Sequence, residues 1–196
     1  MKRYLWGMGL SIALASGAAW AGDTPVEGWS LDRLMAGMRQ IRTESAHFVE
    51  LKTVHLLTRP IRATGTLTYV APGKLEKITL THAPETIKLD GGMLTGTRAD
   101  GEEFSVDIDS HEEVAALVEG IRSTLAGDLA TLQRHYELAF SGDGEHWRID
   151  LAPKARRVRE KVDQIRIQGS GTVIGTIIVS EKDGDRSEMT ITPDTP

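Results

Sequence analysis

The chain has 196 residues, a formal net charge of −5 and no cysteine. The lack of cysteine excludes disulfide bonds, thiol catalysis and thiolate metal sites. Nucleic acid is also excluded as a partner, because the chain is mildly acidic and has no basic segment interleaved with aromatic residues.

The first 21 residues have the layout of a secretory signal peptide. Lys2 and Arg3 form a basic start, an apolar run rich in small residues follows, and Ala19-Trp20-Ala21 matches an A-x-A cleavage site. The run is too short for a stable membrane span, which disfavours the alternative of an uncleaved anchor. A lipoprotein signal would need a cysteine at the cleavage point. We therefore expect an exported, non-lipidated protein that is cleaved near Gly22 and forms a single domain over residues 22–196.

A helix followed by several strands is predicted for the first half of the mature chain. Ser30 suits an N-cap, and Leu31, Leu34, Met35 and Met38 recur at helical spacing after it. The period then shifts toward two. Turn residues separate six predicted strands, at 47–57, 63–71, 74–80, 85–89, 93–97 and 102–108. Short strands in quick succession favour an antiparallel sheet or barrel.

A second helix interrupts the strands. Ser110 and Glu113 fit a capping box for a helix over 111–126, and Gly127 fits its end. Its apolar stripe consists of Val114, Leu117, Val118, Ile121 and Leu125. Asp128 fits the cap of one more short helix, at 129–135. Further strands are predicted at 136–142, 145–153, 162–169, 172–181 and 187–193.

About eleven strands are too many for a flat sheet, so the sheet must curl or close. The apolar stripe of the helix at 111–126 needs a covered surface, and the mouth of the curled sheet offers one. The predicted fold is α+β and mainly β. It is a curved antiparallel sheet that forms an incomplete barrel of about 11 strands, with an N-terminal helix and a helical lid.

The face of residues 65–80 that carries Leu67 and Tyr69 is apolar, while threonines occupy the other face. Such a face could belong to a filled core or to the wall of a pocket, and alternation is the same in both cases. Glu50 and Lys52 share a strand face with Phe48, and a solvated face is the default expectation for them. If that face looks into a cavity, the two charges must neutralise each other or be partnered by Lys77 or Arg186.

Catalytic and metal-binding motifs are lacking. The histidines show no ligand spacing on a helix, and Gly169-Ser170-Gly171 fits a hairpin turn better than a nucleophile elbow. Residues 183–188 contain acidic residues but lack the spacing of a calcium loop, so a turn between residues 182 and 187 is expected instead. We expect no catalytic residues and no metal site.

The segments 65–80 and 89–96 resemble the periplasmic lipoprotein carriers of the LolA family, and most closely their divergent LolA-related branch. Supporting stretches are residues 48–65, 121–129, 146–153 and 181–193. Their order and spacing together carry the resemblance, which runs from about Trp29 to Pro193.

The resemblance implies an incomplete barrel with helices over an apolar cavity. It implies binding of lipid or lipoprotein acyl chains and their transport toward the outer membrane, with no catalysis and no cofactor. A monomer, an inner-membrane donor complex and an outer-membrane acceptor are further implications. The residues expected to line the cavity and lid are Leu67, Tyr69, Ala71, Leu75, Phe104, Val106, Val114, Leu117, Val118, Ile121 and Trp147.

The sequence also departs from the family pattern. The main branch has an arginine that helps to hold the lid closed, and Ala71 stands at that position here. Another acylated or polyene metabolite of an envelope export pathway is therefore an alternative cargo. An enzyme acting on an envelope lipid is a further alternative, disfavoured because no nucleophile–base pair or metal set emerges.

Overall fold

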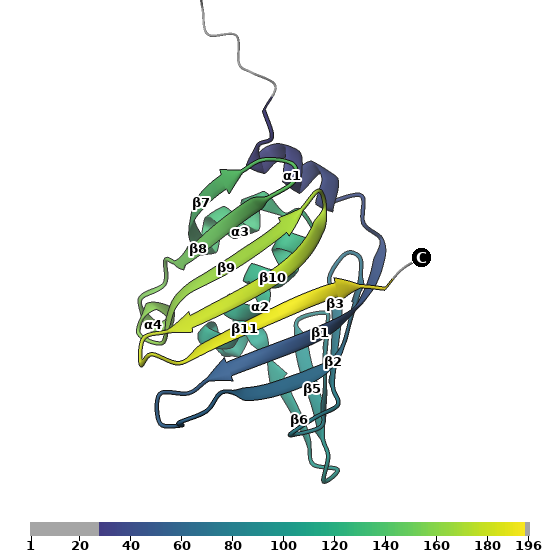
Figure 1. The fold of residues 1–196 in the computed structure, drawn as a ribbon, viewed down its shortest axis with the longest axis vertical. Coiled ribbons are helices and arrows are strands. Elements are labelled where there is room, and N and C mark those ends of the chain that lie inside the picture. Colours follow the sequence, from purple (N-terminus) through teal and green to yellow (C-terminus); the bar gives the residue numbers. More distant parts are fainter. Residues whose placement is uncertain (1–27, 195–196) are drawn as a thin grey trace, which may run out of the picture.

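The structure is a computed structural model that describes residues 28–194, so the expected signal peptide lies outside the described residues. The dominant feature is one antiparallel sheet of eleven strands in the order β6-β5-β4-β3-β2-β1-β11-β10-β9-β8-β7 (Figure 1). The strands are β1 Thr43–Thr53, β2 Ile61–Val70, β3 Lys74–Thr79, β4 Glu85–Asp90, β5 Met93–Arg98, β6 Glu103–Asp107, β7 Tyr136–Gly142, β8 Trp147–Pro153, β9 Val162–Ser170, β10 Val173–Glu181 and β11 Arg186–Pro193.

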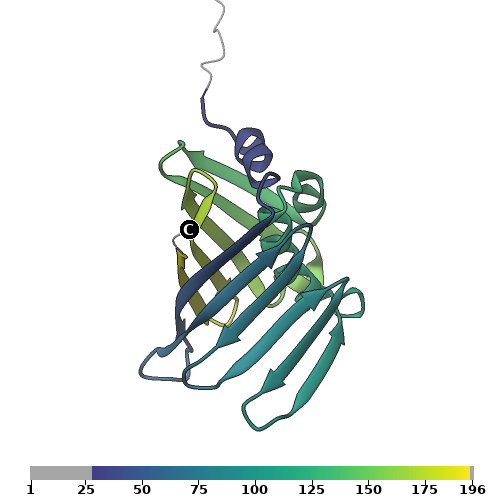
Figure 2. The same ribbon diagram turned by 90° about the vertical axis from the view of Figure 1, so that its right-hand side faces the viewer.

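The sheet is curled, and the helices lie on its concave side (Figure 2). Its first and last strands, β1 and β11, pair with each other in the middle, whereas β6 and β7 form the two edges. Among the described strands no pairing joins β6 to β7, so the barrel is open. The predicted fold class, an incomplete antiparallel barrel with a helical lid, is confirmed.

Side-chain caps define the start of two helices as predicted. Ser30 Oγ accepts a hydrogen bond of 3.2 Å from the Arg33 N–H at the start of α1, Leu31–Met38. Asp128 Oδ1 accepts one of 3.0 Å from the Thr131 N–H at the start of α3, Leu129–His135. A short side chain that satisfies a free N–H stabilises a helix by about 1 kcal/mol.

The capping box predicted for the lid helix is wrong. α2 spans Glu112–Leu125, and its N-cap is His111, which makes no side-chain cap bond. Ser110 instead ends a 3₁₀ turn, Ile108–Ser110, and its hydroxyl donates to Asp107. Ser110, which the sequence pattern assigned to the N-cap, is therefore the last residue of this 3₁₀ turn, and the helix begins one residue later than predicted. The far end agrees with prediction, because Gly127 follows the helix with a φ of +65°.

Two further elements differ from the sequence prediction. β1 covers 43–53 rather than 47–57, and Leu56 lies in the following loop with 80% of its surface exposed. Pairing with both β2 and β11 determines where β1 ends, so the apolar residues beyond it do not extend the strand. A short helix, α4 at Arg156–Arg159, was not predicted.

The hydrophobic core fills one half of the concave side. α1 and α3 contribute Leu34, Met35 and Leu132, which pack with Ile149 of β8 and Ile167 of β9. All five are at most 1% exposed. None of the helices within residues 28–194 is long and apolar enough to cross a membrane.

Candidate ligand-binding site

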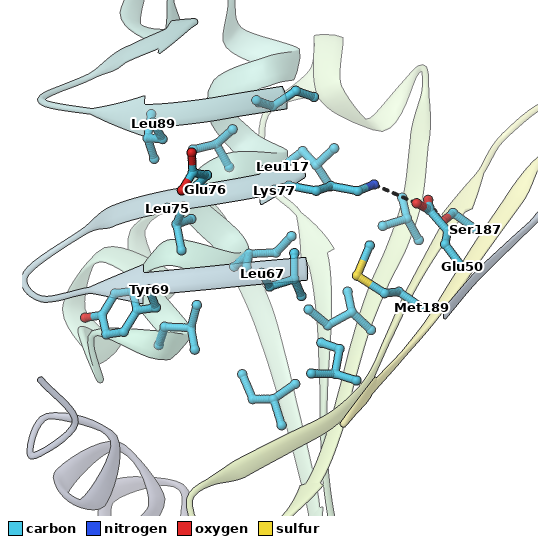
Figure 3. A pocket seen from close by; sticks show the side chains of 18 of the residues that line it. Glu50, Leu67, Tyr69, Leu75, Glu76, Lys77, Leu89, Leu117, Ser187 and Met189 are labelled. Carbon is cyan, nitrogen blue, oxygen red and sulfur yellow. Dashed lines mark hydrogen bonds and ion pairs between the residues drawn. The ribbon is translucent and has the colours of Figure 1, made fainter. Parts of the chain in front are cut away.

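The other half of the concave side is hollow. A cavity of about 450 Å³ lies between the lid helix α2, strands β1–β5 and strands β10 and β11. This volume lies within the range of about 300–1,000 Å³ that is typical of small-molecule sites. Most of the lining side chains are aliphatic, and Figure 3 shows how they converge from the surrounding strands.

The apolar face of residues 65–80 forms one wall of this cavity. Tyr69 of β2 pairs with Leu75 of β3, Leu75 with Leu89 of β4, and Leu89 with Leu94 of β5. Directly paired residues lie on the same face of a sheet, so these four side chains form a row across the strands. All four line the cavity, as does Leu67. The face therefore borders a hollow space rather than a filled core.

The lid helix contributes its apolar stripe to the opposite wall. The stripe residues Val114, Leu117, Val118, Ile121 and Leu125 all line the cavity. On the side of α2 that packs against the core, the buried hydroxyl of Tyr136 donates a hydrogen bond to the carbonyl of Ala116. Burial raises the pKa of Tyr136, so it stays a neutral donor.

Near its end, the lid helix also approaches the β2–β3 turn. Arg122 forms an ion pair with Glu119 one turn earlier, with an Nε–Oε1 distance of 2.9 Å. The Arg122 side chain lies against Gly73, where a Cβ atom would come within 3.1 Å of the arginine Cδ. A charged residue of the lid thus contacts the turn that follows Ala71.

The cavity contains a charged cluster on its β1 wall. Lys77 of β3 extends toward β1, where its Nζ lies 2.6 Å from Glu50 Oε2 (Figure 3). Ser187 of β11 donates to the other oxygen, with an Oγ–Oε1 distance of 2.5 Å. Glu50 and Lys77 are only 18% and 28% exposed. The default expectation of a solvated face for Glu50 is therefore wrong, and the alternative, a cavity-facing charge partnered by Lys77, is what the structure shows.

The pKa of Glu50 reflects two opposing effects. Burial alone would raise it, but the positive charge of Lys77 and the hydrogen bonds from Lys77 and Ser187 lower it below its ordinary value. Lys52 lines the same cavity and lowers it further. Glu50 is thus held as an anion. Glu44 also lines the cavity, but burial raises its pKa.

Four residues expected in the site lie outside the cavity lining. Trp147 is in the filled core, where its Nε1–H donates to the Gly171 carbonyl over 2.9 Å. Phe104 and Val106 belong to the edge strand β6, beyond the strands that enclose the cavity. Ala71 lies in the turn after β2, with its N–H bonded to the Arg42 carbonyl. The expectation that these side chains line the cavity is therefore corrected.

Sequence reasoning missed the contribution of the last two strands. Ile177 and Val179 of β10, with Met189 and Ile191 of β11, line the cavity opposite the lid. Their alternation was visible in the sequence, but it does not say that β11 pairs with β1 and thereby faces the same hollow as β2.

One group of described residues offers metal ligands. Ligand atoms of His55, Asp183 and Asp185 lie within 4.8 Å of one another at the β10–β11 hairpin. The His55 N–H and ring both bond Asp185, with a ring Nδ1–Oδ1 distance of 2.7 Å. Hydrogen bonding thus holds His55 against Asp185. Asp183 and Asp185 lie in the turn between β10 and β11, which agrees with the turn predicted between residues 182 and 187.

Comparison with known proteins identifies one family. The family described as "Outer membrane lipoprotein carrier protein LolA-like" matches residues 21–192. No curated protein matches the chain.

Three solved structures share features of the fold at low identity. A LolA superfamily protein from Nitrosomonas europaea is 10% identical, with a TM-score of 0.45 over 86% of this chain and 96% of that one. A DUF1329 family protein from Desulfovibrio piger is 8% identical, with a TM-score of 0.47 over 83% and 88%. A chain of the Pseudomonas aeruginosa MucA/MucB complex is 11% identical, with a TM-score of 0.40 over 83% and 54%. These likenesses are too distant to bear on function.

Proposed function

Because the chain belongs to the outer membrane lipoprotein carrier protein LolA-like family, we propose that it is a carrier of acyl chains. It binds the chains of lipoproteins or related lipids in the cavity beneath α2 and carries them across the periplasm toward the outer membrane. The observation that carries this proposal is the apolar cavity of about 450 Å³, which is walled by a sheet on one side and an amphipathic helix on the other. Burial of apolar surface in such a site favours binding by roughly 25 cal/mol per Å².

The cavity suits binding and release rather than catalysis. The apolar stripe of α2 and the aliphatic side chains of the sheet line the same cavity. Contacts between such groups are non-directional. Such contacts can slide apart to admit a chain without leaving a buried donor unpaired. The hydrogen bond from Tyr136 to Ala116 lies on the side of α2 that packs on the core, so it can act as the pivot.

The proposal has two further parts. The protein is exported and cleaved near Gly22, and it acts as a monomer between an inner-membrane donor and an outer-membrane acceptor. They follow from the first 21 residues and from the family.

The test is to purify the protein from the periplasm and to weigh it by native mass spectrometry before and after organic extraction. We expect a mass excess that extraction removes, and an acyl-bearing compound in the extract. A protein without excess mass that also fails to bind a fluorescent fatty acid would contradict the proposal.

A second cargo is favoured by one observation. The Lys77–Glu50 pair lies inside the cavity, where a small amphiphile that enters whole could meet it. The alternative of an acylated or polyene metabolite in an envelope export pathway is therefore kept. The compound found by extraction distinguishes the two cargoes.

A further inference from the structure

The charged cluster of Lys77, Glu50 and Ser187 crosses the inside of the sheet. Lys77 belongs to β3 and Glu50 to β1, so the ion pair passes over β2. On β2, Gly65 pairs with Phe48 of β1. The Phe48 ring lies so close to Gly65 that a Cβ atom added to this glycine would come within 2.8 Å of it. The Lys77 ammonium lies 5.0 Å from the centre of that ring. Phe48 thus supports a cation at this end of the cavity.

Within the cluster, Lys77 is the group with hydrogen-bond donors left over, whereas the oxygens of Glu50 and Ser187 keep acceptor lone pairs. One Glu50 oxygen accepts from Lys77 and the other accepts from Ser187, whose single hydroxyl proton is used in that bond. An ammonium has three protons, and Glu50 takes one of those of Lys77. Lys52 adds a second positive charge to the same wall.

Three further carboxylates line the cavity, those of Glu44, Glu76 and Glu181. Glu76 is paired with Lys88, and burial raises the pKa of Glu44. An anion would have to lie nearer to Lys77 than to these carboxylates.

We infer that this cluster is a headgroup subsite, in which Lys77 donates hydrogen bonds to the carboxylate or phosphate of a single-chain amphiphile. The chain of that ligand fills the apolar remainder of the cavity, so the inference rests on the proposed function. Glu50, which itself accepts a hydrogen bond from Ser187, holds the ammonium in place, and the Phe48 ring lies 5.0 Å from it. A chain end without an acceptor would displace water from Lys77 without replacing its hydrogen bonds, and a neutral hydroxyl would replace them more weakly than an anion does.

The experiment compares ligands that share one chain and differ at the headgroup. Dodecanoate, dodecyl phosphate and dodecanol are titrated against protein loaded with N-phenyl-1-naphthylamine, a neutral fluorophore whose own binding does not involve an anion. We expect at least one of the two anions to bind about tenfold or more tightly than dodecanol, the effect of one hydrogen bond to a charged group. Acetate and inorganic phosphate should not displace the fluorophore, because they lack the chain.

The substitution Lys77→Met removes the donor and keeps an apolar side chain of similar length. It should reduce the preference for the anion to less than about twofold while dodecanol still binds, since the chain contacts remain. Lys74→Met is the matched control: it lies on the same strand, is exposed, pairs with Asp90 and does not line the cavity. It should keep the wild-type preference.

The variant Lys77→Met leaves Glu50 without its cation, so the double variant Lys77→Met/Glu50→Gln is measured beside it. The double variant removes both charges of the ion pair and should show the same loss of preference, with a native circular dichroism spectrum.

Each outcome separates the two claims. Equal affinity of the wild-type protein for all three ligands would overturn the subsite and leave the carrier function standing. So would an anion preference that persists in both folded variants. Failure of every dodecyl ligand to displace the fluorophore would contradict the carrier function itself.

Discussion

Glu50 and Lys77 carry opposite charges inside a cavity that is otherwise largely apolar. Charged side chains are rarely buried without a partner, which is why a solvated face was the default expectation for Glu50. The partner lies two strands away in the sheet and 27 residues away in the sequence. No local pattern connects them, because the pairing of β1 and β3 with β2 brings the two side chains to the same face of the sheet.

The ion pair makes stability depend on pH in a defined direction. The pKa of Glu50 is lowered in the folded protein, so its stabilising contribution is present at neutral pH and is lost as pH falls through the lowered value. At pH 7 we expect Glu50→Gln to lower the free energy of unfolding by about 1–2 kcal/mol, since it loses a charge-assisted hydrogen bond. As pH falls through the lowered pKa the two proteins should converge, because the wild-type side chain then becomes neutral too.

Urea denaturation at pH 7 and along a series of decreasing pH values measures this difference. Asp90→Asn is the matched control, because Asp90 pairs with Lys74 on the surface. An exposed pair of this kind contributes about 0–1 kcal/mol. A gap between wild type and Glu50→Gln that is as large at low pH as at pH 7 would contradict the assigned ionisation.

A second residue-scale prediction concerns the attachment of the lid. Tyr136 begins β7, and its hydroxyl bonds the Ala116 carbonyl of α2. Tyr136→Phe removes only that hydroxyl, and the loss of one buried hydrogen bond should lower the free energy of unfolding by about 0.5–1.5 kcal/mol. Urea denaturation gives the value. An unchanged unfolding midpoint would show that the hydroxyl does not help to hold the helix.

At the scale of the elements, the strands were predictable because each carries a local signal. The boundaries of β3 and β7 agree with prediction almost to the residue, since turn residues flank a clear alternation. The predicted bounds of β1 lie too far along the chain, because the apolar residues Val54, Leu56 and Leu57 follow the last paired residue. Long-range pairing overrides local preference there.

The division between core and cavity could not be predicted from alternation. Ile149 of β8 and Leu67 of β2 both face the concave side, and both belong to alternating strands. The first is covered by α1 and α3, whereas the second faces the hollow beneath α2. Which helix covers which half of the sheet depends on tertiary packing, and so Trp147 was wrongly assigned to the cavity.

This division predicts different results for the same substitution in two helices. Val118 of α2 lines the cavity, and Val158 of α4 is 1% exposed in the core. Val158→Asp should cost several kcal/mol, because the carboxylate is buried in packed apolar surroundings. Val118→Asp should leave a folded protein, since a charge facing a hollow can be hydrated, but it should bind acyl chains at least about tenfold more weakly.

Circular dichroism and displacement of a fluorescent fatty acid measure the two effects side by side. Folding of Val158→Asp with unchanged stability would contradict its place in the core. Undiminished ligand binding by folded Val118→Asp would contradict the role of the lid stripe.

At the scale of the whole molecule, the first 21 residues predict where the protein is found. An intact secretory signal should direct the chain to the periplasm and be removed, leaving a mature N-terminus near Gly22. N-terminal sequencing of protein released by osmotic shock tests this. Recovery of Met1 from the membrane pellet would instead indicate an uncleaved anchor.

A ligand that binds in the cavity of the open barrel should raise the free energy of unfolding by an amount that follows from its concentration and Kd. A ligand that binds only the folded protein raises the free energy of unfolding by about 2.7 kcal/mol at a concentration of 100 times Kd. In a domain of this size each kcal/mol raises Tm by about 2–4 °C, so saturation should raise it by about 5–10 °C. Dodecanol is the suitable ligand, because it carries no charge and its binding depends mainly on the apolar part of the cavity, and thermal unfolding followed by circular dichroism gives the shift. Val118→Asp provides the control, since a lid that no longer closes over the chain should show little or no shift. An equal shift in this variant would place dodecanol elsewhere on the molecule, and the cavity would then not be the site that couples binding to stability.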